Sequence, residues 1–329
     1  MDISGFIEKV EEIVERHRIE EGQYARYLWQ DKKESRKMGV NEYGCADAAN
    51  ILYTIGHFPK EPQKREEWII TLQKMQNPQT GLYFEGTHHT IHTTAHCIAA
   101  LELFDASTLY PLTELLKYLN YEEMAVFLAG LDWGNNPWNN SHQGAGLAAA
   151  FMITRTADMK WRKKYFEWLN QNNDRDTGLG ISGHPGAAPL SHQLFGWFHY
   201  LFNYENAREA FPNPERLIDS CIDMYQNGGL PDAFGKSVGF MEIDWVFAMN
   251  RASRQTAYRF DEIKMLLLDF TQKYIPWLDS LDEKKDEGLN DLHLLFGAMC
   301  ALAELQIALP GEIDSEVPLK NVLDRRPFI

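Results

Sequence analysis

Histidines gather in one short stretch of the chain, T-H-H-T-I-H-T-T-A-H, which runs from Thr87 to His96 and holds four of the protein's eleven histidines. On a helix, His92 and His96 stand four residues apart and share one face, a spacing that helical zinc sites use. The stretch therefore predicts one of two arrangements. Either His92 and His96 hold a divalent metal such as zinc together with a ligand from elsewhere, or these histidines line a pocket.

A second set of polar residues recurs along the chain at intervals of about fifty residues. The tripeptide S-H-Q occurs at residues 141–143 and again at residues 191–193. Each member of the set precedes a segment rich in apolar and small residues, such as T-T-A-H-C-I-A-A-L-E-L or Q-G-A-G-L-A-A-A-F-M-I. We call the six members the anchor residues, and they are Asp47, His92, His142, His192, Asp244 and His293.

The segments that begin at the anchor residues are hydrophobic nearly all round, which is typical of buried helices. Before and between them lie amphipathic segments, such as residues 3–14 at the start of the chain, with apolar residues at helical spacing. Alternating strand patterns are short, so the chain is predicted to be all-α. Six hairpins of one amphipathic and one buried helix predict an (α/α)6 toroid that forms a single domain over residues 1–329, with the tail 309–329 packing outside the ring. The anchor residues would then meet at one mouth of the ring.

The sequence Q-N-P-Q-T-G-L-Y-F, followed by H-T-T-A-H-C-I-A-A-L-E-L, resembles the repeat of terpenoid cyclases and protein prenyltransferases. The resemblance extends over residues 20–308 and implies the toroid fold. In the prenyltransferases, zinc is held by an aspartate, a cysteine two residues later and a more distant histidine. Asp244 and His293 stand at the aspartate and histidine positions, but Val246 stands where the cysteine is expected. The aspartate-rich motifs of the cyclases are also missing from this sequence.

Composition narrows the classes of partner. The formal net charge is −15, which argues against nucleic acid and anionic membrane surfaces as partners, because both need clustered lysine and arginine. No apolar run approaches twenty residues, so no membrane insertion is expected. The four cysteines are far apart in apolar contexts, and the first residues lack the pattern of a signal peptide. A cytoplasmic protein is therefore expected.

The anchor residues are the predicted catalytic residues of a polar funnel. The stretch L-D-W-G-N-N-P-W before His142 offers aromatic faces beside polar groups, as sugar recognition requires. The predicted substrate-binding residues are Trp133, Trp138, Asp132, Glu242 and His96. We expect an enzyme that acts by acid–base catalysis on a neutral polar substrate, either a small molecule or an oligosaccharide, with carbohydrate as the favoured class.

Two other functions stay open from the sequence. A cyclase- or prenyltransferase-like enzyme with an isoprenoid substrate predicts an apolar and aromatic interior below the polar rim. A toroid that only binds a ligand predicts no perturbed titrating pair in the funnel. The recurrence of the anchor residues also permits a purely structural role, in which each side chain caps the start of its own helix.

Overall fold

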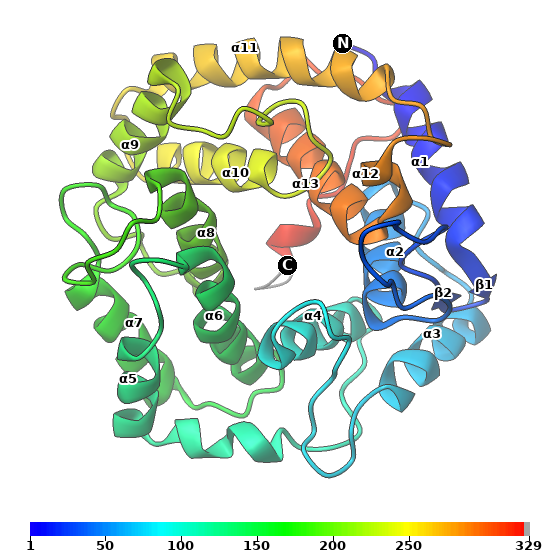
Figure 1. Cartoon of the computed structure of the whole chain (residues 1–329), viewed down its shortest axis with the longest axis horizontal. Coiled ribbons are helices and arrows are strands. Elements are labelled where there is room, and N and C mark those ends of the chain that lie inside the picture. Colours follow the sequence, from blue (N-terminus) through cyan, green and yellow to red (C-terminus); the bar gives the residue numbers. More distant parts are fainter. Residues whose placement is uncertain (326–329) are drawn as a thin grey trace.

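The computed structural model describes residues 1–325, and the regular structure of this part of the chain is mostly helical, which confirms the all-α prediction (Figure 1). One short antiparallel strand pair, β1 (Arg18–Glu20) and β2 (Gln23–Tyr24), follows the first helix. None of the helices described in residues 1–325 combines the length and the apolar character needed to cross a membrane.

Six helices, here called the inner helices, pack side by side in a closed cycle in which each contacts the next and the last contacts the first (Figure 1). Their residues are buried nearly all round, as expected of helices that lack a polar face. The inner helices are α2 (Glu42–Thr54), α4 (Thr90–Leu103), α6 (Pro137–Ile153), α8 (Leu190–Ala207), α10 (Met241–Ser253) and α13 (Leu292–Ala308).

The outer helices alternate with the inner helices along the chain and lie around them (Figure 1). They are α1 (Ser4–His17), α3 (Pro62–Lys74), α5 (Tyr121–Ala129), α7 (Met159–Asn172), α9 (Pro214–Asn227) and α11 (Phe260–Asp279). Helix α1 buries Phe6, Val10 and Ile13, which recur at helical spacing on one face, while its other face is exposed. This single apolar stripe gives an outer helix only one side to pack against an inner helix.

Helices α6 and α8 approach closely because a glycine stands at their contact. A Cβ atom at Gly196 of α8 would lie 2.8 Å from the backbone carbonyl oxygen of Pro137, the first residue of α6. No other residue fits there without a shift of the neighbouring helix. The close approach also brings the rings of His142 and His199 together, with 4.8 Å between their centroids.

The Q-N-P-Q-T-G-L loop at residues 76–82 has a structural role. Gly81 adopts a positive φ of 78°, and a Cβ atom there would lie 1.9 Å from the carbonyl oxygen of Pro111. The buried Gln76 side chain donates to the carbonyl oxygens of Gly81 and Tyr110, at 2.7 and 2.8 Å. The loop thus ties the end of α3 to the segment before the 3-10 helix η1 (Thr113–Leu119).

The tail meets inner helices. Its short 3-10 helix η2 (Val322–Asp324) contacts α2 and α8, and Figure 1 shows it in the middle of the view. Arg251, near the end of α10, donates to Asp324 and to the buried Glu304 of α13. These contacts lie toward the ends of the inner helices that are opposite the anchor residues. The prediction for the tail covered residues 309–329, of which 326–329 lie outside the described residues.

Candidate functional site

The anchor residues lie in the first two turns of the inner helices, but they do not cap them. The side chain of Asn41 accepts from the backbone N–H of Tyr43 and caps α2. His89 caps α4 in the same way, and Asp291 caps α13. Helices α6, α8 and α10 have no side-chain cap. The side chains of the anchor residues are therefore available for contacts inside the fold.

A cavity of about 330 Å³ lies at the starts of the inner helices. Its lining includes five of the eleven histidines, which are His88, His92, His142, His199 and His293. An apolar wall faces them, made of Trp138, Val238, Phe240, Met241 and Leu294. The remaining lining residues are Arg26, Asn139, Ser237 and Gly239. No carboxyl group lines the cavity among residues 1–325.

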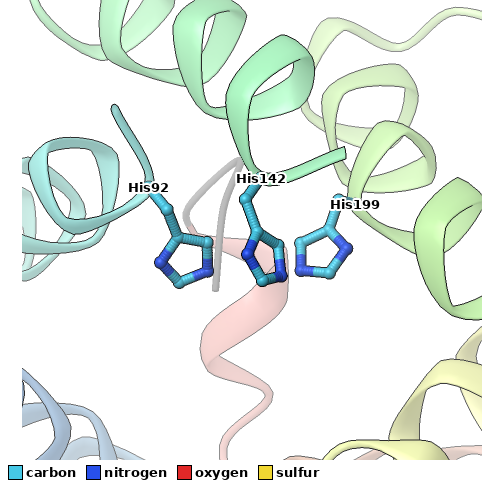
Figure 2. A group of neighbouring side chains, drawn as sticks. All are labelled: His92, His142 and His199. Atoms are coloured by element: carbon cyan, nitrogen blue, oxygen red, sulfur yellow. The ribbon is translucent and has the colours of Figure 1, made fainter. Parts of the chain in front are cut away.

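Metal-ligating atoms converge in two groups of three residues, and within each group they lie within 4.8 Å of one another. The three-histidine group consists of His92, His142 and His199, and Figure 2 shows their rings side by side. The aspartate group consists of Asp47, His96 and His293. The sequence paired His92 with His96 as metal ligands, whereas the fold places each of them in a different group.

Neutral partners surround the three-histidine group. The Nδ1 atom of His92 shares a hydrogen bond with the hydroxyl group of Tyr43. The Nδ1 atom of His199 lies 3.1 Å from the carbonyl oxygen of Phe195 and 3.2 Å from the Ser141 hydroxyl oxygen. A carbonyl oxygen can only accept a hydrogen bond, so the Nδ1 atom of His199 must carry the hydrogen.

Burial keeps these imidazoles neutral. It lowers the pKa of His92 and of His142 well below the usual value, and the neighbouring histidines lower both further. Burial also lowers the pKa of His199 to about 4, although its hydrogen bond to Phe195 acts in the opposite direction. The same cause lowers the pKa of His88. Near pH 7 each ring therefore offers one nitrogen lone pair, as a base or a metal ligand requires.

The aspartate group is built around one buried carboxylate. Asp47 is wholly buried, and its two oxygens bond to His96 Nε2 at 2.7 Å and to His293 Nδ1 at 3.1 Å. Burial raises the pKa of Asp47, but its attraction and hydrogen bonds to the two imidazoles outweigh burial and hold that pKa below its usual value. Asp47 thus fixes the orientation of His293, which lines the cavity.

Two other anchor residues do not line the cavity. His192 is half-buried beside Trp138, with 6.1 Å between the ring centroids. Asp244 is wholly buried in α10, and neither of its carboxyl oxygens has a hydrogen-bond partner within residues 1–325. Burial, and then the nearby Glu242, raise the pKa of Asp244 well above its usual value, which favours the protonated form of this carboxyl group.

The predicted substrate-binding residues also separate. Trp138 lines the cavity, but Trp133 is buried in the core and donates from Nε1 to the carbonyl oxygen of Leu128 at 2.8 Å. Asp132 is exposed and accepts from the backbone of its own turn. Glu242 accepts from the backbone N–H of Gly235 and from the Ser237 hydroxyl group, and burial raises its pKa to about 7. His96 does not line the cavity and bonds to Asp47 at 2.7 Å.

Sequence reasoning missed His199 and His88 as cavity residues. His199 follows His192 by seven residues, which places it two turns along the same face of α8 and deeper in the fold. His88 precedes His92 by four residues, and their ring centroids lie 4.8 Å apart. Helical spacing from an anchor residue was therefore a usable signal for His199, whereas His88 lies in the loop just before the cap of α4.

One further cavity residue, Arg26, left no signal in the sequence. Its guanidinium donates to both carboxylate oxygens of Asp291, at 2.8 and 2.9 Å. The same group lies 3.5 Å from Glu85 and donates to the Thr87 hydroxyl group. Among the described lining residues Arg26 is the only lysine or arginine, and its guanidinium is already engaged by Asp291, Glu85 and Thr87. An anionic ligand therefore has no uncommitted cation to meet in this cavity.

Comparisons with models of known protein families, with curated proteins and with solved structures find no match for this chain. What the protein does must therefore be inferred from the cavity and from the two groups of side chains that surround it.

Proposed function

We propose that the chain forms an (α/α)6 toroid of six helical hairpins. The closed cycle of inner helices and their alternation with outer helices support this architecture. The same plan explains why one cavity collects histidines from α4, α6, α8 and α13, because the N-terminal ends of inner helices meet at one mouth of such a ring.

We propose that the protein is an enzyme that transfers protons on a small neutral substrate, with His293 as the general base. One observation carries this proposal: the buried Asp47 carboxylate holds Nδ1 of His293, a residue that lines the cavity. A carboxylate on one ring nitrogen fixes the tautomer, so the other nitrogen carries the lone pair and can accept a proton. The carboxylate also stabilises the imidazolium that then forms.

The lining indicates the class of substrate. A volume of about 330 Å³ suits a molecule of the size of one sugar ring or a similar compound. Trp138 offers an aromatic face, and Asn139 and the histidines offer hydrogen bonds, which together suit a carbohydrate. No carboxyl group lines the cavity among the described residues, so a mechanism with two carboxylates has no support. Imidazole side chains are the groups available for proton transfer.

An isoprenoid substrate is the second candidate, and the apolar wall favours it. Val238, Phe240, Met241 and Leu294 form a surface against which a branched hydrocarbon would pack. Arg26 is committed to Asp291, so the site suits an uncharged isoprenoid better than a diphosphate. Binding without catalysis has less support, because an ionised buried carboxylate beside neutral buried histidines is typical of reactive sites.

The experiment is a search for turnover in heavy water. The purified protein is incubated with a mixture of sugars, sugar derivatives, isoprenoid alcohols and other small metabolites, and mass spectrometry follows loss of compounds and uptake of deuterium. His293→Gln is the test variant, because glutamine keeps a donor for Asp47 but cannot accept a proton. His192→Gln is the matched control, because His192 does not line the cavity.

We expect the wild-type protein and His192→Gln to convert the same compound. His293→Gln should convert it about 100- to 10,000-fold more slowly, which is the usual contribution of a general base. Equal rates in His293→Gln and the wild-type protein would remove His293 from the mechanism. No conversion of any compound by the wild-type protein would favour the binding function instead.

A further inference from the structure

We propose that His92, His142 and His199 bind one Zn²⁺ ion in the cavity. Their side chains come from three consecutive inner helices, α4, α6 and α8, and Figure 2 shows the three rings in a row with His142 in the middle. One nitrogen of each ring lies within 4.8 Å of the other two. Zinc–nitrogen bonds of about 2.0–2.1 Å place tetrahedral ligand nitrogens roughly 3.4 Å apart, so the rings need to close by about an ångström.

The hydrogen bonds of the outer ring nitrogens prepare the rings as ligands. His199 donates its Nδ1 hydrogen to the Phe195 carbonyl oxygen, so the neutral ring carries its lone pair on Nε2. The Nδ1 atom of His92 is engaged by the Tyr43 hydroxyl group, whose oxygen lies 3.4 Å from the Thr93 hydroxyl oxygen. Outer partners of this kind fix the orientation of zinc-binding imidazoles. The His142 side chain makes no hydrogen bond within residues 1–325 and is held by packing against its neighbours.

The charges around the cavity favour a cation. Arg26 faces two carboxylates, those of Asp291 and Glu85, and therefore compensates only one of them. Asp47 adds another buried carboxylate in the neighbouring group. A divalent ion on three neutral imidazoles would balance this excess of negative charge without any further side chain.

The ligand set selects the metal and its role. Imidazoles without thiolates or carboxylates suit Zn²⁺, and three protein ligands leave one coordination position open to water or substrate, as in catalytic zinc sites. The ring centroid of His293 lies 6.2 Å from that of His92, so the Asp47-oriented base lies beside the three-histidine group. The role of His293 as a base beside the zinc ion rests on the proposed function, whereas zinc binding itself does not.

The test measures metal binding directly, without any need for turnover. Untagged protein is stripped with a chelator, dialysed and titrated with ZnCl₂ against a chromophoric chelator, and the bound zinc is counted by elemental mass spectrometry. Co²⁺ replaces Zn²⁺ in a parallel titration to report a four-coordinate site by its visible absorbance. His142→Ala is the test variant, because His142 borders the cavity and loses no hydrogen bond. His192→Ala, another histidine of a neighbouring helix, is the control.

We expect about one zinc ion per chain in the wild-type protein and in His192→Ala, and at least about 100-fold weaker binding in His142→Ala. Absence of zinc binding by the wild-type protein would overturn the proposal. Equal affinity in His142→Ala and the wild-type protein would also overturn it, and loss of zinc in His96→Ala alone would assign the ion to the aspartate group. Turnover that survives complete removal of zinc but fails in His293→Gln would reject a role of the zinc ion in catalysis and keep the proposed general base.

Discussion

The three-histidine group and the aspartate group adjoin one another, with 6.2 Å between the ring centroids of His92 and His96, yet their histidines have different partners. In the first group the bonded ring nitrogens face a tyrosine hydroxyl group and a backbone carbonyl oxygen. In the second group, two rings share one buried carboxylate. The comparison teaches that the partner of one ring nitrogen decides what the other nitrogen can do.

Neutral partners leave an imidazole uncharged, which suits coordination of a metal ion. A carboxylate partner instead favours the protonated ring and suits a base that must carry a proton for a short time. The two groups therefore have complementary roles in the proposed site. They should also respond differently to substitution, to pH and to the loss of a hydrogen-bond partner.

The largest difference between the two groups should appear in the free energy of unfolding, measured on protein from which a chelator has removed any metal. Asp47→Ala leaves two buried imidazole N–H groups without their acceptor, and each unsatisfied buried donor costs about 1–3 kcal/mol in free energy of unfolding. His142→Ala should cost less than about 1 kcal/mol, because His142 loses no hydrogen bond and already borders the cavity. Urea unfolding of both variants measures the two values. Similar losses in both would contradict the distinction between the groups.

The pH dependence of stability should be the next largest difference. The folded-state pKa of His199 is about 4, below its usual value of about 6.5, so between these values the unfolded chain binds a proton that the folded chain does not. The stability that the neutral His199 side chain contributes is complete above pH 6.5 and is lost as the pH falls towards 4. The loss should reach up to about 3 kcal/mol.

Urea unfolding of the metal-free protein at several pH values tests this dependence. His199→Gln, which stays neutral and can still donate to the Phe195 carbonyl group, should show a correspondingly smaller loss on acidification. Asp47 has a lowered pKa, so its contribution is present above the usual carboxyl pKa and is lost only at more acidic pH. A wild-type protein and a His199→Gln variant with the same pH profile would show that burial does not hold His199 neutral.

The smallest effect should follow from Tyr43→Phe, which removes the hydrogen-bond partner of His92 and leaves the ring in place. Loss of an outer partner weakens zinc binding about 10- to 100-fold. The hydrogen bonds of Asp47 should persist, and nuclear magnetic resonance of the histidine ring nitrogens can follow them in the same sample. Unchanged zinc affinity in Tyr43→Phe would mean that packing alone orients His92.

Hydrophobic periodicity predicted the helices and their burial, because a helix without a polar face, such as α13, must be surrounded by other helices. The anchor series also predicted correctly that polar residues stand at the starts of inner helices. It did not predict which side chains line the cavity. His192 and His199 share one face of α8, and the chain around them gives no indication of which one faces the cavity.

The sequence by itself determined the all-α class, the alternation of amphipathic and apolar helices and the supply of histidines at their starts, because these depend on local periodicity. Only the tertiary structure decided that His92 joins His142 and His199 while His96 joins Asp47, that Trp133 belongs to the core, and that Arg26 is committed to Asp291. Such pairings depend on contacts between residues far apart in the chain. The geometry of these pairings is set by how closely helices such as α6 and α8 pack. That distance depends on several segments together and cannot be read from any one of them.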